Sequence, residues 1–180
     1  MTVRKVLRYG DIKLREPAKE VHKISKKIHE LVQDMLDTMY AQNGVGLAAP
    51  QIGESYRIFV IDTSANDEPL TPRVFINPKI IKKSGHITTQ EGCLSFPEAF
   101  IDVKRYSEVT VKALDINGHP FVLEAKDGSL EARAIQHEND HLDGILFVDH
   151  CVNRFEADET LKKFNLPPVE PDRLIEDEVD

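Results

Sequence analysis

The clearest chemical signal in this sequence is a pair of histidines four residues apart. Residues 137–141 read His-Glu-Asn-Asp-His, which is the pattern H-E-x-x-H. Positions i and i+4 share one face of a helix, so His137 and His141 can bind one metal ion while Glu138 stays beside it as a base. The same run also fits a helix whose histidines only pack or face water, so by itself it leaves the metal site open.

The surrounding residues predict the helix that would carry this run. Ser129 is a typical helix N-cap, and Gly144 is typical of the position after a helix end. One stripe of the helix recurs at spacings of four, three and four, and consists of Leu130, Ala134, His137 and His141. A second set, which we expect to form a solvated flank, consists of Arg133, Gln136 and Asp140. The stripe is therefore predicted to face the site.

A catalytic site of this kind needs a third protein ligand and keeps one coordination position open for water. His150 lies nine residues after His141 and has no supporting pattern. Upstream, Cys93 follows Gly92 in Glu-Gly-Cys-Leu-Ser, and a thiolate is a strong ligand for divalent iron, nickel or zinc. A free cysteine is usually a small buried hydrophobe, which is our interpretation of Cys151. Taken alone, Cys93 fits that packed role better than a ligand role.

A run of small residues surrounds a single amide. Residues 44–53 read Gly-Val-Gly-Leu-Ala-Ala-Pro-Gln-Ile-Gly. The small residues let another backbone approach closely, and Gln51 can offer two N–H donors to a developing oxyanion. The alternative is a helix C-cap at Asn43-Gly44 followed by a tight loop.

Three motifs in this order and spacing resemble the signature of the peptide deformylase family. They are Gly44-x-Gly46-x-Ala48-Ala49-x-Gln51, Glu91-Gly92-Cys93-Leu94-Ser95 and Gln136-His137-Glu138-x-x-His141. The resemblance implies an enzyme that removes the formyl group from N-formyl-methionine at the start of newly synthesised polypeptides and releases formate. One alternative is an H-E-x-x-H metallopeptidase, whose third ligand would usually be a downstream Glu or His. A non-catalytic binding module is the other, although such proteins tend to lose a ligand or the base.

The resemblance also implies catalytic roles. The metal ligands would be Cys93, His137 and His141. Glu138 would take a proton from the attacking water and deliver it to the departing amine. The Gln51 amide and the backbone N–H of Leu94 would stabilise the oxyanion. We expect one divalent ion, Fe²⁺ by family association, while Zn²⁺, Ni²⁺ or Co²⁺ would also suit these donors in a purified sample.

The family binds its substrate as an added strand, here beside Gly46 and Gly92. The pocket for the methionine side chain would be lined by Val45, Leu130 and Ala134. Many deformylases have an arginine three residues after the proline that follows the second motif. That proline is Pro97 here, and the position is occupied by Phe100. We predict that Phe100 gives a more apolar pocket rim, and the alternative is that it joins the core.

The predicted fold class is α+β, with antiparallel strands packed around the H-E-x-x-H helix and an N-terminal amphipathic helix. Ser25 precedes that amphipathic helix, whose apolar residues at helical spacing are Ile28, Leu31, Val32, Met35, Leu36, Met39 and Tyr40. Strands are expected at residues 57–62, 74–76, 107–115 and 120–125, the last two as a hairpin across Asn117-Gly118. A further helix is expected at residues 153–164.

Length and composition predict one catalytic domain over residues 1–164 and an acidic, proline-rich, mobile tail over residues 165–180. The chain has 180 residues, 41% of them hydrophobic, and a net charge of −8. No apolar run approaches the ~20 residues that span a bilayer. The N-terminal segment has basic residues but no apolar stretch after them, so it is not expected to be a secretory signal. Two cysteines give no disulfide framework. We therefore expect a cytoplasmic enzyme without membrane contact.

The expected partners are N-formyl-methionyl nascent polypeptides, with a transient association with the ribosome. The acidic tail would give no electrostatic help against an RNA-rich surface, and it argues against direct binding to DNA.

Overall fold

The computed structural model describes residues 2–64 and 67–176, and their fold is α+β as predicted. The helices are α1 (Lys26–Ala41), α2 (Leu130–Leu142) and α3 (Arg154–Lys163), and the 3-10 turns are η1 (Ile12–Arg15), η2 (Ala49–Ile52), η3 (Phe147–His150) and η4 (Pro171–Arg173). The strands are β1 (Gly46–Ala48), β2 (Ile58–Ile61), β3 (Arg73–Ser84), β4 (Ile87–Cys93), β5 (Phe96–Arg105), β6 (Glu108–Leu114) and β7 (Pro120–Ala125). None of the helices in this described part of the chain is long and apolar enough to cross a membrane.

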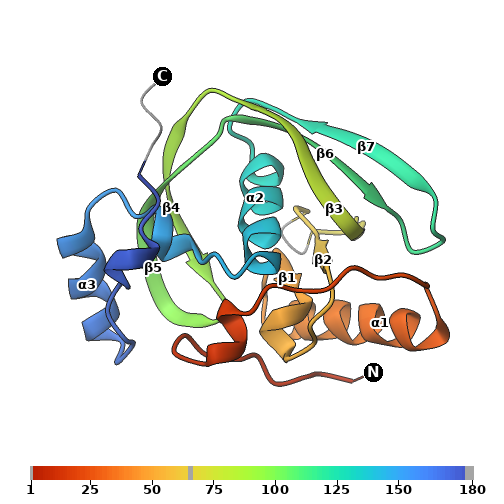
Figure 1. Ribbon diagram of the computed structural model, residues 1–180, viewed down its shortest axis with the longest axis horizontal. Coiled ribbons are helices and arrows are strands. Elements are labelled where there is room, and N and C mark those ends of the chain that lie inside the picture. The colour runs from red at the N-terminus through yellow and green to blue at the C-terminus, as the bar shows by residue number, and fades with distance from the viewer. Residues whose placement is uncertain (1, 65–66, 177–180) are drawn as a thin grey trace.

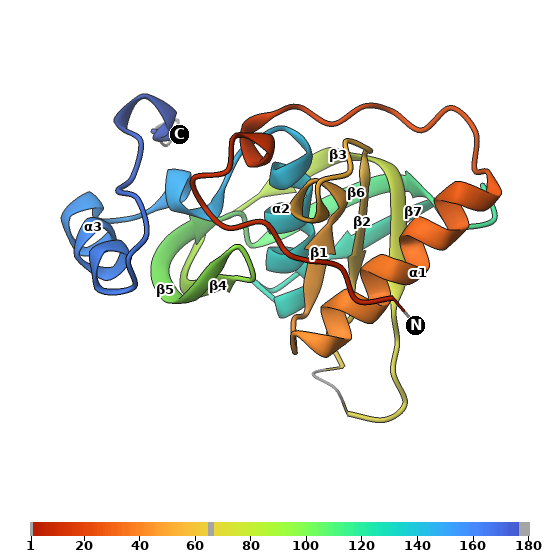
Figure 2. The ribbon, with the colours of Figure 1, turned by 90° about the horizontal axis from the view of Figure 1, so that it is seen from below.

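Two antiparallel sheets surround α2, which lies at the centre of Figure 1. The larger sheet has the strand order β1-β2-β3-β6-β7, and the smaller one is the β4–β5 hairpin. Alternate residues of β2 enter different cores: Phe59 and Ile61 pack with α2, whereas Ile58 and Val60 pack with α1. Because successive strand side chains point to opposite faces, the two helices cover opposite faces of this sheet. Figure 2 shows α1 running beside β1 and β2.

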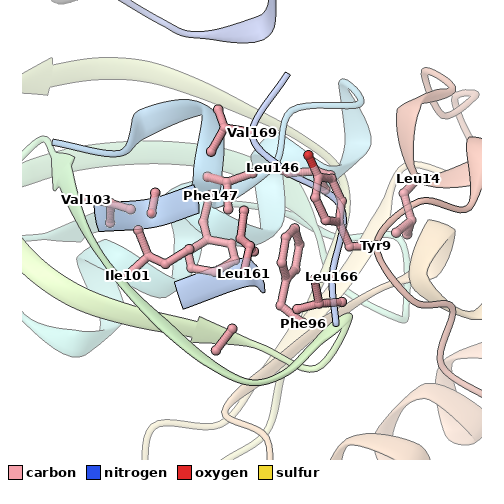
Figure 3. Packing of buried hydrophobic residues seen from close by; sticks show 13 residues of the cluster. Tyr9, Leu14, Phe96, Ile101, Val103, Leu146, Phe147, Leu161, Leu166 and Val169 are labelled. Atoms are coloured by element: carbon pink, nitrogen blue, oxygen red, sulfur yellow. The ribbon is translucent and has the colours of Figure 1, made fainter. Parts of the chain in front are cut away.

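A third core lies between β5, η3, α3 and the chain beyond it (Figure 3). The rings of Tyr9 and Phe96 stack with centroids 4.3 Å apart, and Phe147 meets Phe96 edge-on at 4.7 Å. Leu166 and Val169 are buried in the same core. The predicted domain end at residue 164 is therefore too early, because Leu166 and Val169 still pack into this core. Residues 177–180 of the predicted tail lie outside the described residues, and its mobility stays a prediction.

The segments with local signals have the predicted structure. Helix α1 follows Ser25, β6 and β7 form the predicted hairpin, and α3 lies within residues 153–164. The strand predicted at residues 74–76 is part of the much longer β3. The β4–β5 hairpin was not predicted, because β4 reads Ile-Thr-Thr-Gln-Glu-Gly-Cys and lacks an alternating apolar pattern.

Packing of the chain beyond α3 predicts a large effect on stability. Leu166→Ala removes a buried leucine, which typically costs about 2–5 kcal/mol in the free energy of unfolding. Ile175→Ala, at a residue 43% exposed, is the matched control and should change stability by less than about 0.5 kcal/mol. Denaturant unfolding of both variants measures the difference. Equal, small effects would show that residues 165–176 do not pack on the domain in solution.

Candidate metal centre and substrate pocket

Helix α2 begins and ends where its sequence directs. The Ser129 side chain accepts a hydrogen bond from Ala132 N over 3.1 Å and so caps the first turn. Gly144 follows the helix at φ +71°, and a Cβ there would collide with the backbone oxygen of Arg15. The helix is thus held at both ends, with His137, Glu138 and most of its other residues buried.

The H-E-x-x-H histidines meet the cysteine at the end of β4. One ligand atom from each of Cys93, His137 and His141 lies within 4.8 Å of the others. Cys93 Sγ and His141 Nε2 are 3.5 Å apart. A thiolate and two imidazoles form a donor set that suits divalent iron, zinc, nickel or cobalt, so these residues fit a resident metal ion. The structure thus brings together the predicted ligands, and the upstream cysteine occupies the place that a metallopeptidase would usually give to a downstream Glu or His.

Hydrogen bonds between buried side chains lead outward from His137. Its Nδ1 lies 2.9 Å from Glu91 Oε1, and Arg105 donates to both Glu91 oxygens over 2.9 Å. Arg105 Nη1 also donates to Asp140 Oδ2 over 2.6 Å, and His150 Nε2 lies 2.9 Å from that same oxygen. Such contacts set the orientation of a metal-ligating imidazole. His150, which we considered as a third ligand, contacts Asp140 instead.

The two carboxylates near His137 have pKa shifts of opposite direction. Burial favours the neutral form of both. At Glu91 the positive charge of Arg105 and the hydrogen bonds from His137 and Arg105 outweigh burial, and they hold its pKa well below the usual range. At Glu138 burial prevails and raises the pKa to about 7. Glu138 Oε2 is buried without a hydrogen-bond partner among the described residues, as a group that exchanges protons with a substrate would be.

The pKa values of the two metal-ligand histidines also shift in opposite directions. Burial lowers the pKa of both, but at His137 the interactions with Cys93 and Glu91 outweigh burial and raise its pKa well above the usual value. At His141 the nearby positive charge of His137 adds to burial and keeps its pKa well below that value. The low pKa of His141 favours the neutral imidazole, which is the form that binds a metal ion, whereas His137 must release a proton to bind one.

The flank of α2 that we expected to be solvated is largely buried, so this prediction was wrong. The Gln136 side chain accepts from Tyr106 N and donates to Tyr106 O, both over 2.9 Å. Asp140 contacts Arg105, as described above. Arg133 is half-buried at the pocket wall, where its Nε donates to Gly128 O. Gln136 and Asp140 are polar because they meet Arg105 at the end of β5 and the backbone of Tyr106 just after it. Hydropathy alone cannot distinguish such buried polar contacts from contact with water.

Gln51 is held in a fixed orientation beside the metal ligands. Its Oε1 accepts a hydrogen bond from Ala48 N over 2.9 Å, so the amide NH₂ group points the other way. That group lies 3.4 Å from Cys93 Sγ and 3.1 Å from Ser95 Oγ, and donates to both. The glutamine therefore already interacts with the ligand sulfur, a contact that the sequence did not indicate.

A pocket of about 480 Å³ opens beside these groups. The residues predicted to bind or activate the substrate all line it: Val45, Gly46, Gln51, Gly92, Leu94, Phe100, Leu130, Ala134 and Glu138. Phe100 is 57% exposed at the rim, so the alternative that it joins the core is wrong. Its ring packs on Gly92, where a Cβ would lie 2.7 Å from Phe100 Cε1.

Arg105 and Asp140 support this site without having been predicted to do so, and Glu91 and Ser95 were noted only as part of a motif. One signal was present: Glu91 and Arg105 are charged residues in segments that also contain β-forming residues. The pairing of Glu91 with Arg105 depends on the β4–β5 hairpin, and the contact between Arg105 and Asp140 joins residues 35 positions apart. No local pattern could therefore identify either contact.

The chain is similar to known proteins over most of its length. Residues 3–156 match the polypeptide deformylase family. Peptide deformylase 1 of Clostridium perfringens is 52% identical over 145 residues, which are 80% of this chain and 95% of that protein. The crystal structure of a Synechococcus elongatus peptide deformylase in complex with actinonin covers 92% of both chains with a TM-score of 0.87 and 44% identity. That of a Legionella pneumophila peptide deformylase, at 43% identity, covers 91% of this chain and 96% of its own with a TM-score of 0.83. With a matching fold, and with Cys93 beside the two histidines of the H-E-x-x-H helix, the chain belongs to the polypeptide deformylase family.

Proposed function

We propose that this enzyme removes the N-formyl group from formyl-methionine at the N-terminus of newly synthesised polypeptides and releases formate. The observation that supports this proposal is the position of the metal ligands. One ligand atom from each of Cys93, His137 and His141 lies within 4.8 Å of the others, beside a pocket that Glu138 also lines. The family implies formylated nascent peptides as the substrate.

Cys93, His137 and His141 would hold one divalent metal ion. When bound, such an ion polarises a carbonyl oxygen and lowers the pKa of water from ~15.7 toward ~7. We propose Fe²⁺ as the ion in the cell, by association with the family. Zn²⁺, Ni²⁺ or Co²⁺ could replace it in a purified sample, because one thiolate and two imidazoles accept all four ions. Metal analysis of protein purified without oxygen, paired with activity on a formylated peptide, tests this identity.

Glu138 acts as the general base and then as the general acid. Its carboxylate accepts the proton of the attacking water and passes it to the amine that leaves the formyl carbon. Burial raises the pKa of this carboxyl group toward neutral pH, which suits a group that first accepts and then donates a proton. Gly46 leaves room for this side chain, since a Cβ at that position would lie 2.7 Å from Glu138 Oε1.

The Gln51 amide and the backbone N–H of Leu94 stabilise the oxyanion that forms at the formyl carbon. Gln51 is suitable because its NH₂ group is already directed toward Cys93 by the bond from Ala48 N to its oxygen. Its two N–H groups donate to Cys93 and Ser95 in this structure, so one of these bonds must be exchanged for a bond to the oxyanion. One such donor typically contributes about 2.7–4 kcal/mol.

The peptide binds as an added strand along Gly46 and Gly92, and the methionine side chain enters the pocket beside Val45, Leu130 and Ala134. Each of these five residues lines the pocket. The carbon-rich walls suit an unbranched thioether side chain.

The nascent polypeptide places this reaction in the cytoplasm, with a transient association with the ribosome. The two cysteines are unpaired, which fits a reducing compartment. Sedimentation with purified ribosomes, with and without residues 170–180, would measure that association and the contribution of the acidic tail.

Replacement of the base should separate chemistry from metal binding. Glu138→Gln keeps the size of the side chain but cannot accept the proton, so turnover of formyl-Met-Ala-Ser should fall by ~10²–10⁴-fold while the metal content stays at the wild-type level. The peptide without its formyl group is the control, and neither protein should cleave it. Turnover of the variant at a near wild-type rate would remove Glu138 from the chemistry.

Replacement of each cysteine should distinguish the third ligand from a packed thiol. Cys93→Ser should lower both metal content and activity, because the remaining two imidazoles make a weak site. Cys151→Ser is the matched control and should retain both. Metal analysis after dialysis provides the comparison, and equal metal content in the two variants would contradict the ligand assignment.

The exposed ring at the rim should influence which second residue the enzyme prefers. Phe100→Arg replaces an apolar face with hydrogen-bond donors, so the ratio of kcat/KM for formyl-Met-Leu to formyl-Met-Ser peptides should fall. Because Phe100 is mostly exposed, the melting temperature should change little. An unchanged ratio would mean that the substrate does not reach this ring.

A further inference from the structure

We propose that His150 is a positioning residue for the metal ligand His137, acting through Asp140, Arg105 and Glu91. This inference rests on the metal site described above, and it gives a role to a residue that the proposed chemistry does not use. His150 belongs to η3, and its side chain is 20% exposed. The connection to His137 consists of four successive side-chain contacts, none longer than 2.9 Å.

The outer end of this connection is a carboxylate oxygen shared by two side chains. His150 Nε2 and Arg105 Nη1 lie 2.9 and 2.6 Å from Asp140 Oδ2. With the proton on Nε2, His150 donates to that oxygen and so fixes the rotation of the carboxylate that faces the guanidinium. Without the imidazole, Asp140 would keep one protein donor at this oxygen and could turn toward solvent.

The inner end transmits that orientation because a guanidinium is planar and rigid. Arg105 uses Nη1 for Asp140, and it uses Nε and Nη2 for the two oxygens of Glu91. A rotation that follows Asp140 would therefore loosen the paired bonds to Glu91. Glu91 Oε1 also contacts His137 Nδ1, which determines the imidazole nitrogen left for the metal ion.

The backbone at His150 is held by different contacts, so its side chain can be changed separately. The neighbouring Asp149 accepts two hydrogen bonds from Arg15, over 2.6 and 3.1 Å, and one from Leu146 N over 2.9 Å. These contacts keep η3 in place after substitution of His150. A loss of metal affinity in the variant would then report on the side chain and not on displacement of the turn.

The test compares metal affinity in four proteins. His150→Ala removes the donor, His150→Gln retains a side-chain N–H donor, and His119→Ala is the control at a histidine that is 79% exposed. Affinity for Co²⁺ and Zn²⁺ is measured by competition with a chelator, and the absorption spectrum of the Co²⁺-loaded protein reports the ligand geometry. We expect His150→Ala to weaken both affinities about tenfold, the lower end of the effect of outer contacts on a metal site. His150→Gln should restore most of this loss, and His119→Ala should match the wild type.

A double-mutant cycle tests the route. If His150 acts through Asp140, His150→Ala should cause no further loss of affinity in an Asp140→Asn background. Unchanged affinity and spectrum in His150→Ala, equal losses in the Ala and Gln variants, or additive losses in the double variant would each overturn the proposal. A wild-type protein that binds Co²⁺ and deformylates peptides while His150→Ala behaves identically would refute only this inference. Failure of the wild type to bind either metal would refute the metal site itself.

Discussion

The buried ion pairs of Arg105 determine how the parts of this active site meet. Arg105 lies on β5 and is 3% exposed, its partner Glu91 lies on β4, and its other partner Asp140 lies on α2. Separating the hairpin from α2 would leave Glu91 on Arg105 but remove Asp140, and losing a hydrogen bond between charged groups typically costs about 1.5–3 kcal/mol. The β4–β5 hairpin is therefore fixed against α2. Because β4 ends at Cys93 and α2 contains His137, the same constraint sets the distance between the metal ligands.

This arrangement also explains how two nearby glutamates can have different roles. Glu91 has a guanidinium partner and stays ionised, whereas Glu138 has none and has a pKa of about 7. A bound cation would lower both pKa values. The ionised group can therefore orient His137, while the group with the higher pKa remains available for proton transfer. The chemistry thus depends less on the residue type than on which carboxylate Arg105 reaches.

The sequence predicted those features that depend on neighbouring residues. The capped α2, the amphipathic α1 and the β6–β7 hairpin have local signals at their ends, and the family motifs indicated the residues that meet at the metal centre. The β4–β5 hairpin was missed because β4 lacks an alternating apolar pattern. Asp140 was assigned to a solvated flank because its partner lies 35 residues earlier. The acidic composition after residue 164 likewise concealed Leu166 and Val169, which are isolated apolar residues whose burial depends on a tertiary surface.

The motif glycines illustrate the difference between recognising a pattern and explaining it. Six glycines have a positive φ, but Gly46 and Gly92 are not among them. Backbone conformation therefore does not require glycine at these two positions, and the available space does. A Cβ at Gly46 would press on Glu138, and a Cβ at Gly92 would press on the ring of Phe100. Alanine at either position would displace a side chain that lines the pocket, namely the proposed base Glu138 or the ring of Phe100. Gly46 and Gly92 are therefore positions where the strand backbone lies directly against side chains that line the pocket.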